Sequence, residues 1–111
     1  DYLLANREDI DAIIGLGDLV PGSIARVFDQ VGVAAGEIPV VGWGNSLDTT
    51  QEVLNGYVNA AQWQDPLATS WIGLSIADMG AAGIPPGFDV IVGALYEADT
   101  AQVYDDILSG N

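Results

Sequence analysis

The chain has 111 residues, of which 16 are acidic and two are basic, and its net charge at pH 7 is -14. Such a charge repels nucleic-acid phosphates and anionic lipid headgroups, so we expect neither as a partner. Cysteine, histidine and lysine are absent, which excludes thiolate chemistry, cysteine-based metal sites, Schiff-base lysines and the usual general base at neutral pH. Half of the residues are apolar, and the length suits one folded domain over residues 1–111.

The first third of the chain predicts a helix, a strand and a second helix. Residues 2–4 continue a helix-like pattern from the first residue, so we expect the chain to be a piece of a longer protein. Residues 10–16 form a nearly continuous apolar run, which is typical of a strand covered on both faces. Apolar residues within 24–31 recur at helical spacing, and Gly32 follows where helices often end.

Two strands and a short helix are predicted in the middle of the chain. Residues 40–43 and 57–62 have the composition of strands. Between them, Asp48 and Gln51 resemble the capping box of a short helix, which the following Asn-Gly pair ends.

The last part of the chain predicts a helix, a strand and a final helix. Asp65-Pro66 is a strong helix start, because aspartate caps helices and proline suits the first helical position. The helix runs through Met79 and is apolar on most sides, so we expect it to be well buried. Residues 90–95 predict a fourth strand, and residues 103–108 predict a short amphipathic helix.

This alternation of strands and helices predicts an α/β fold with a mostly parallel sheet flanked by helices. The ligands of such sheets collect at the carboxyl ends of the strands. The loops after Ile14, Val41 and Gln62 are therefore the first place to look for a functional site.

Candidate ligand-binding residues in these loops are Asp18, Trp43, Asn45 and Gln64. Trp43 offers a flat face for stacking, and a few amide and carboxylate groups in an apolar-walled cleft suit a polar uncharged ligand. Structural roles compete with binding, since tryptophan is often half-buried core and short polar residues form turns and caps. Gln64 has no obvious local task.

A nucleotide is the alternative ligand for the first loop. Gly15, Gly17 and Gly22 follow a strand and open a helix, as in dinucleotide-binding loops. However, four residues separate the second and third glycines instead of two, and the acidic residue expected after the next strand is missing. No phosphate-binding Gly-Lys-Ser/Thr motif follows either. We therefore expect no nucleotide, no other cofactor, no metal and no catalytic residue.

Three motifs in this order resemble the carboxyl-terminal lobe of type I periplasmic binding proteins. They are the first strand with Gly17-Asp18, the segment Ile38–Ser46, and Gln64-Asp65-Pro66 at a helix start. The family includes ribose- and galactose-binding proteins, and the ligand domains of lactose-repressor-family regulators share its fold. The resemblance implies two α/β lobes that close on a ligand about crossing hinge strands. This chain would hold the later part of the second lobe and the last hinge crossings, with residues 92–104 as the closing strand and helix.

The resemblance also implies roles for single residues. Gln64 matches a glutamine that contacts ligand near the hinge. Gly17 stands where many members carry a ligand-binding asparagine, and Gly44 stands where many carry an aspartate that grips sugar hydroxyls. Two contacts to a polyol are therefore missing, which favours a less hydroxylated ligand or one held by Trp43 and Asn45.

The implied function is that of the solute-binding component of an ABC-type transport system, or its sensory counterpart, in the periplasm or lipid-anchored outside the cytoplasm. Its partners would be a small polar, sugar-like ligand, a membrane permease or sensor, and either the missing amino-terminal lobe or a second copy of the chain. Three alternatives stay open: an effector-binding domain of a lactose-repressor-family regulator, an enzyme that uses carboxylates alone, and a lobe without ligand. A helix-turn-helix upstream would favour the regulator, and a signal peptide would exclude it.

Overall fold

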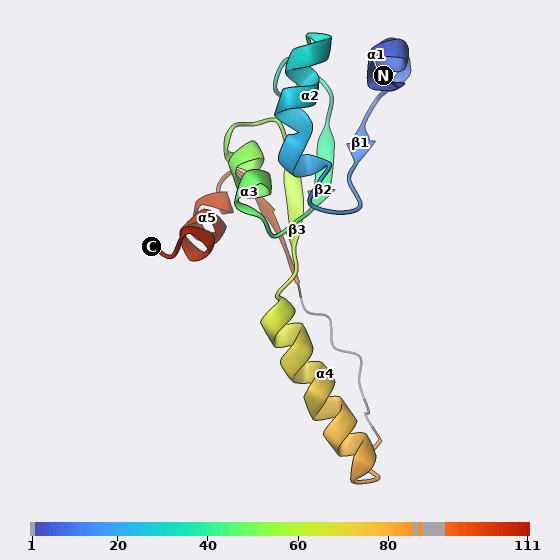
Figure 1. Ribbon diagram of the computed structural model, residues 1–111, viewed down its shortest axis with the longest axis vertical. Helices are drawn as coiled ribbons and strands as arrows, with labels where there is room; N and C mark the ends of the chain where they lie inside the picture. The colour runs from blue at the N-terminus through green and yellow to red at the C-terminus, as the bar shows by residue number, and fades with distance from the viewer. Residues whose placement is uncertain (1, 86, 88–92) are drawn as a thin grey trace. The chain divides into compact units, whose positions relative to one another are not determined.

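The computed structural model describes residues 2–85, 87 and 93–111 (Figure 1). The chain forms two compact units, which are Asp1–Trp63 with Leu95–Asn111, and Gln64–Ala94. The first unit contains α1 (Tyr2–Asn6), η1 (Arg7–Asp9), β1 (Ile13–Ile14), η2 (Pro21–Ser23), α2 (Ile24–Val31), β2 (Val40–Trp43), α3 (Leu47–Leu54), β3 (Ala60–Trp63) and α5 (Ala101–Ser109), where η denotes a 3-10 helix. Helix α4 (Pro66–Ala81) belongs to the second unit, and β4 (Ala94–Glu97) starts at the last residue of that unit.

The strands lie in the order β1-β2-β3-β4 in a mostly parallel sheet, which confirms the predicted α/β fold. Strand β1 runs parallel to β2 with Ile13 opposite Val40, and β2 runs parallel to β3 with Gly42 opposite Ala61. The carboxyl ends of these three strands therefore lie at one edge of the sheet. This edge is where the sequence predicts a site.

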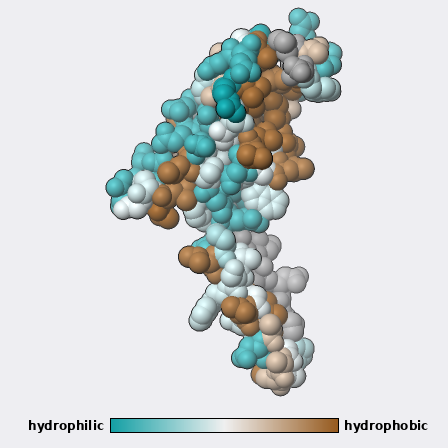
Figure 2. All heavy atoms as spheres, viewed as in Figure 1, coloured by the Kyte–Doolittle hydropathy of each residue, from teal (hydrophilic) through white to brown (hydrophobic). Residues whose placement is uncertain are grey.

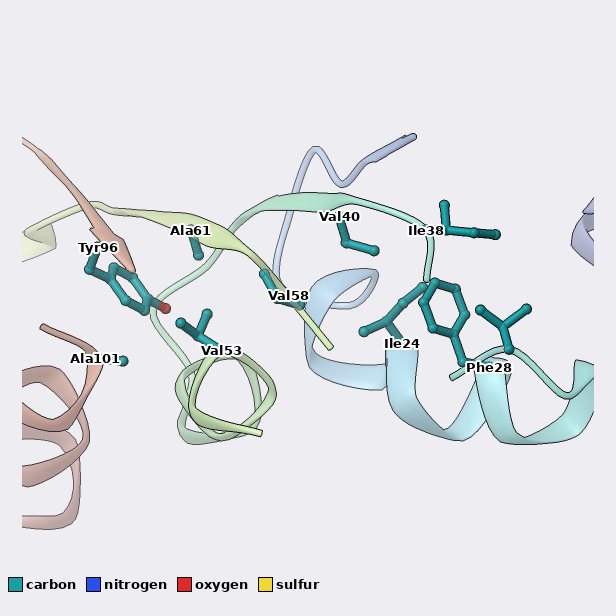
Figure 3. Packing of buried hydrophobic residues seen from close by; sticks show 10 residues of the cluster. Ile24, Phe28, Ile38, Val40, Val53, Val58, Ala61, Tyr96 and Ala101 are labelled. Carbon is teal, nitrogen blue, oxygen red and sulfur yellow. The ribbon is translucent and has the colours of Figure 1, made fainter. Parts of the chain in front are cut away.

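The core of the first unit lies between the sheet and helices α2, α3 and α5 (Figure 3). Phe28 of α2 and Val40 of β2 lie toward one end of this core, and Val53 of α3 lies beside Tyr96 at the other. All four side chains are fully buried. Burial of one large apolar side chain contributes about 1.5–3 kcal/mol, so this cluster is the main source of stability in the unit.

The opposite face of the sheet is exposed along β1 and β2 among the described residues. Buried and exposed residues alternate along β2, with Val41 and Trp43 exposed, and Ile14 of β1 is 74% exposed. Figure 2 shows an apolar patch in the region of β1 and β2. The prediction that the first strand is covered on both faces is therefore wrong for the described part of the chain. The strand is also shorter than predicted, because only Ile13–Ile14 pairs with β2.

The boundaries of α2 and α3 follow sequence signals, with one exception. Helix α2 covers the predicted apolar stripe and ends at Gly32, whose φ of 68° lies in the left-handed region that glycine tolerates. Helix α3 is capped by Ser46, whose hydroxyl accepts a hydrogen bond from the Thr49 amide at 3.2 Å. The predicted capping box at Asp48 is wrong, because Ser46 already has the extended backbone that a cap needs and Asp48 lies inside the first turn.

The second unit is built around α4. As predicted, Asp65 caps this helix by accepting a hydrogen bond from the Ala68 amide at 2.8 Å, and Pro66 is the first helical residue. However, no residue of α4 is buried, and Trp71 is 74% exposed. The prediction of a well-buried helix is therefore wrong for the described residues. Helix α4 is exposed because no other helix is described within Gln64–Ala94 to cover its apolar surface.

The later part of the chain contains β4 and α5. The strand predicted over residues 90–95 falls largely outside the described residues, and β4 is Ala94–Glu97. The predicted last helix is confirmed as α5. Among the helices of the described ranges, none has the length and apolar character needed to span a membrane.

Candidate functional site

Two loops meet at the carboxyl edge of the parallel strands. The first is the loop after β1 with the start of η2, residues 15–22, and the second is the end of β2 with the segment before α3, residues 43–46. We call these two segments the rim. Three of the four predicted ligand-binding residues, Asp18, Trp43 and Asn45, lie in the rim. The structure therefore brings these three together, as the order of parallel strands predicts.

The Asp18 carboxylate joins the two loops of the rim. Its Oδ2 accepts a hydrogen bond from the Asn45 amide at 3.1 Å, and its Oδ1 accepts one from the Ser46 amide at 3.0 Å. The Oδ1 atom also accepts bonds from the hydroxyls of Ser46 at 2.8 Å and Thr49 at 2.9 Å. Partial burial raises the pKa of Asp18, but the bonds from Asn45, Ser46 and Thr49 outweigh burial and hold this pKa below its ordinary value.

The rim is packed so closely that it depends on glycines. A Cβ atom at Gly44 would lie 2.1 Å from Asp18 Oδ1 and 2.7 Å from Thr49 Oγ1. A Cβ atom at Gly42 would lie 2.5 Å from the Pro21 Cβ, because the first loop passes directly over β2. These close approaches are the reason for glycine at both positions. The aspartate that the family resemblance implies at position 44 has no room beside Asp18 as it lies here.

Hydrogen bonds to the neighbouring strands β3 and β4 also fix the position of Gly44. Its amide donates to the Gln62 carbonyl at 3.2 Å, and its carbonyl accepts from the Tyr96 hydroxyl at 3.2 Å. Burial, together with the charges of Asp18 and Tyr104, raises the pKa of Tyr96 to about 12, so the phenol stays protonated and donates at physiological pH. Trp43 and Asn45, on either side of Gly44, are therefore presented from a fixed backbone. Trp43 is 37% exposed, and Asn45 is partly buried.

The fourth predicted residue, Gln64, lies in the second compact unit. Its ligand contact stays a prediction. Sequence reasoning missed Ser46, Thr49 and Tyr96. Ser46 and Thr49 carry a local signal, since a serine three residues before a threonine opens α3, but nothing near Tyr96 in the sequence points to the rim.

A polar hollow of about 450 Å³ opens beside the rim, between the first loop, α2 and α3. Arg26, Asp48 and Glu52 line it together with Asp18 and Ser46. Within the described ranges, no three acidic side chains gather closely enough to hold a metal ion.

Glu52, at the wall of this hollow, is a destabilising charge. Its Oε2 atom is buried and has no hydrogen-bond partner among the described residues. Burial, followed by the negative charges of Asp48 and Asp29, raises the pKa of Glu52 above its ordinary value. The folded chain therefore binds this proton more tightly than the unfolded chain. Stability from Glu52 is present below its ordinary pKa and is lost as the pH rises through the raised pKa.

We expect Glu52→Gln to raise the free energy of unfolding at pH 7 by up to about 1 kcal/mol, a small value because the residue is partly exposed. Urea unfolding at pH 4, 5.5 and 7 measures this, and the gain should shrink toward pH 4. Glu8→Gln, at an exposed position, is the matched control and should change little. An equal effect of the two variants at all three pH values would contradict the account of Glu52.

Comparisons with known proteins place this fold. No family model matches the chain, and no curated protein matches its sequence. A crystal structure of a galactofuranose binding protein matches with a TM-score of 0.71 and 18% identity, over 98% of this chain and 38% of that chain. A crystal structure from Mycobacterium smegmatis matches with a TM-score of 0.70 and 17% identity, over 98% of this chain and 37% of that chain.

At these identities the likeness concerns the fold, and the chain spans 38% and 37% of the two matched chains. The expected resemblance is confirmed at that level. The sheet, with the rim at its carboxyl edge, has the fold of part of one lobe of a type I periplasmic sugar-binding protein.

Proposed function

We propose that the chain is part of a solute-binding module that holds a small polar, sugar-like ligand by closure of two lobes and carries out no catalysis. The observation that supports this is the rim: two loops meet at the carboxyl edge of a parallel sheet and present Trp43 and Asn45 from a fixed backbone. A protein with the same fold bears the name galactofuranose binding protein, which makes a sugar the first ligand to test.

Each residue of the proposed site has a distinct task. The exposed face of Trp43 covers the apolar face of a sugar ring, and the side-chain amides of Asn45 and Gln64 exchange hydrogen bonds with its hydroxyls. Such a site needs only a few well-placed polar groups. The absence of histidine, cysteine and lysine from the sequence fits binding better than chemistry.

Closure is proposed as a population shift toward the closed form, driven by ligand contacts to both lobes. In this proposal the closed form is recognised by a membrane permease or a sensor outside the cytoplasm, so the protein is placed in the periplasm or on a lipid anchor. The rest of the binding site comes from the missing lobe or from a second copy of the chain.

The proposal is tested by titrating the full protein with galactofuranose, galactose, ribose and other small polar metabolites. A true ligand should change tryptophan fluorescence and raise the melting temperature, since a ligand at about 100 times its Kd stabilises the folded state by about 2.7 kcal/mol. Trp43→Ala should weaken binding about tenfold or more, as expected for an aromatic side chain at the centre of a site.

Trp71→Ala is the matched control, because Trp71 is an exposed tryptophan of α4 far from the rim in sequence. It should leave the affinity unchanged. Lack of response to every compound in the panel, together with turnover of one of them, would contradict the proposed function.

A further inference from the structure

We propose that Asp18 is a positioning residue of the binding site: its carboxylate holds residues 44–46 in place, so that Trp43 and Asn45 meet the ligand from fixed positions. Asp18 then acts through the rim and does not itself contact ligand, in contrast to the role predicted from the sequence. This inference rests on the proposed function and deepens it.

The Asp18 carboxylate is engaged by the rim at both oxygens, and its Oδ1 atom is saturated with donors. An ionised carboxylate offers about four lone-pair sites. Asp18 accepts four hydrogen bonds, three at Oδ1 and one at Oδ2, at distances of 2.8 to 3.1 Å. A sugar hydroxyl could reach Oδ1 only by displacing one of its three donors. Charge-assisted bonds of this kind contribute more to stability than neutral ones, so displacement is unfavourable.

The groups that donate to Asp18 include backbone amides of the segment that carries the ligand-binding side chains. The two amides held by Asp18 are those of Asn45 and Ser46, which follow Gly44 directly. Gly44 is held on its other side by Tyr96 and Gln62. The segment is thus fixed at consecutive peptide groups, and a fixed segment loses less conformational freedom when ligand binds.

The loop that carries Asp18 is itself anchored on the sheet. It is seated there by Pro21, which is fully buried and lies so close to Gly15 and Gly42 that neither has room for a side chain. The backbone of Asp18 therefore cannot move away from residues 44–46 without lifting the loop. A rigid support of this type is what keeps a binding group within a fraction of an ångström of its productive position.

The experiment combines amide hydrogen exchange with ligand binding in the full protein. In Asp18→Ala, the Asn45 and Ser46 amides should exchange at least about tenfold faster, because each loses a charge-assisted bond. The Asn59 amide, which donates to the Val40 carbonyl at 2.8 Å outside this segment, serves as the internal reference and should keep its protection. The Kd for the sugar found in the titration should rise about tenfold, equivalent to 1.4 kcal/mol.

Asp18→Asn keeps the size of the side chain and is measured in parallel, so that a folding defect in the alanine variant does not stop the test. It should give intermediate changes in exchange and in Kd. Asp48→Asn is the matched control, since it removes one negative charge from the first turn of α3 without touching residues 44–46. Its amide exchange at Asn45 and Ser46 and its Kd should match those of the wild type.

Four outcomes separate this inference from the proposed function. Loss of amide protection together with weaker binding supports the inference. Weaker binding with full protection overturns it, because Asp18 would then contact the ligand directly. Loss of protection with unchanged Kd also overturns it, because the position of the segment would not matter. If the wild type binds no tested sugar, the proposed function fails. In that case, retained protection of the Asn45 and Ser46 amides in both Asp18 variants would overturn the positioning role. Loss of this protection would support the inference that Asp18 holds residues 44–46.

Discussion

Replacing Tyr96 with alanine should lower the free energy of unfolding by about 3–5 kcal/mol, the range for removal of a large buried aromatic side chain. Tyr96 is completely buried in the core of the first unit. Its ring lies 4.7 Å from that of Tyr104, which in turn lies 4.9 Å from Trp63. The variant would leave a cavity between β4 and α5 and would break this row of aromatic rings, whose contacts contribute beyond their buried area.

Tyr96→Phe keeps the ring and removes the hydroxyl, so it measures the contribution of the hydroxyl alone. It removes only the bond to the Gly44 carbonyl, so it should cost about 1 kcal/mol. Tyr2→Ala is the control, because Tyr2 is 77% exposed and its loss should change stability by less than about 0.5 kcal/mol. Urea unfolding followed by circular dichroism gives the three values. A loss below about 1.5 kcal/mol for Tyr96→Ala would contradict the core described for this unit.

The elements that the sequence predicts well are those whose partners lie close by in the same unit. Strand β2 and helix α2 have the predicted bounds, because their apolar residues face a core that the unit itself supplies. Burial of the first strand and of α4 was predicted from composition, and both predictions fail among the described residues. An apolar run shows that a segment has apolar surface to bury. It does not identify the element that covers this surface.

The rim likewise contains one contact that the sequence predicts and others that it does not predict. The parallel order of strands predicts that Asp18 lies near Asn45, and the structure agrees. The bonds of Asp18 to Ser46 and Thr49 join residues 28 and 31 positions apart, and the bond of Tyr96 to Gly44 spans 52 positions. Contacts at such separations depend on loop conformation and side-chain direction, which local patterns do not specify.

The cap of α3 is an instructive case. Ser46 and Asp48 are both good capping residues, and the sequence alone favoured Asp48 because a glutamine follows three residues later. The backbone conformation determines which of the two residues caps the helix. Ser46 has φ of -87° and ψ of 156°, the extended conformation of a cap. That conformation follows from the fixed path of residues 43–46 along the rim, which is a property of the folded sheet.

Gly44→Ala should lower the free energy of unfolding by about 2–4 kcal/mol, combining overpacking with the loss of hydrogen bonds to a charged group. The new methyl group would lie 2.1 Å from Asp18 Oδ1, and a carboxylate held by four donors cannot turn aside without giving up those bonds. Gly17→Ala is the control in the same rim, since a Cβ atom there meets nothing within 4 Å. It should change stability by less than about 0.5 kcal/mol.

The cause of the Gly44→Ala effect can be isolated with a double variant. Asp18→Ala removes the atoms with which the new methyl group collides, so Gly44→Ala should cost less in that background, by at least about 1 kcal/mol. The remaining close contact, to Thr49 Oγ1 at 2.7 Å, involves a hydroxyl that is then released from Asp18 and can rotate. Strictly additive losses in urea unfolding would show that the methyl group does not collide with the carboxylate. Asp18 would then not fill the space beside residue 44, and the close-packed rim would have to be abandoned.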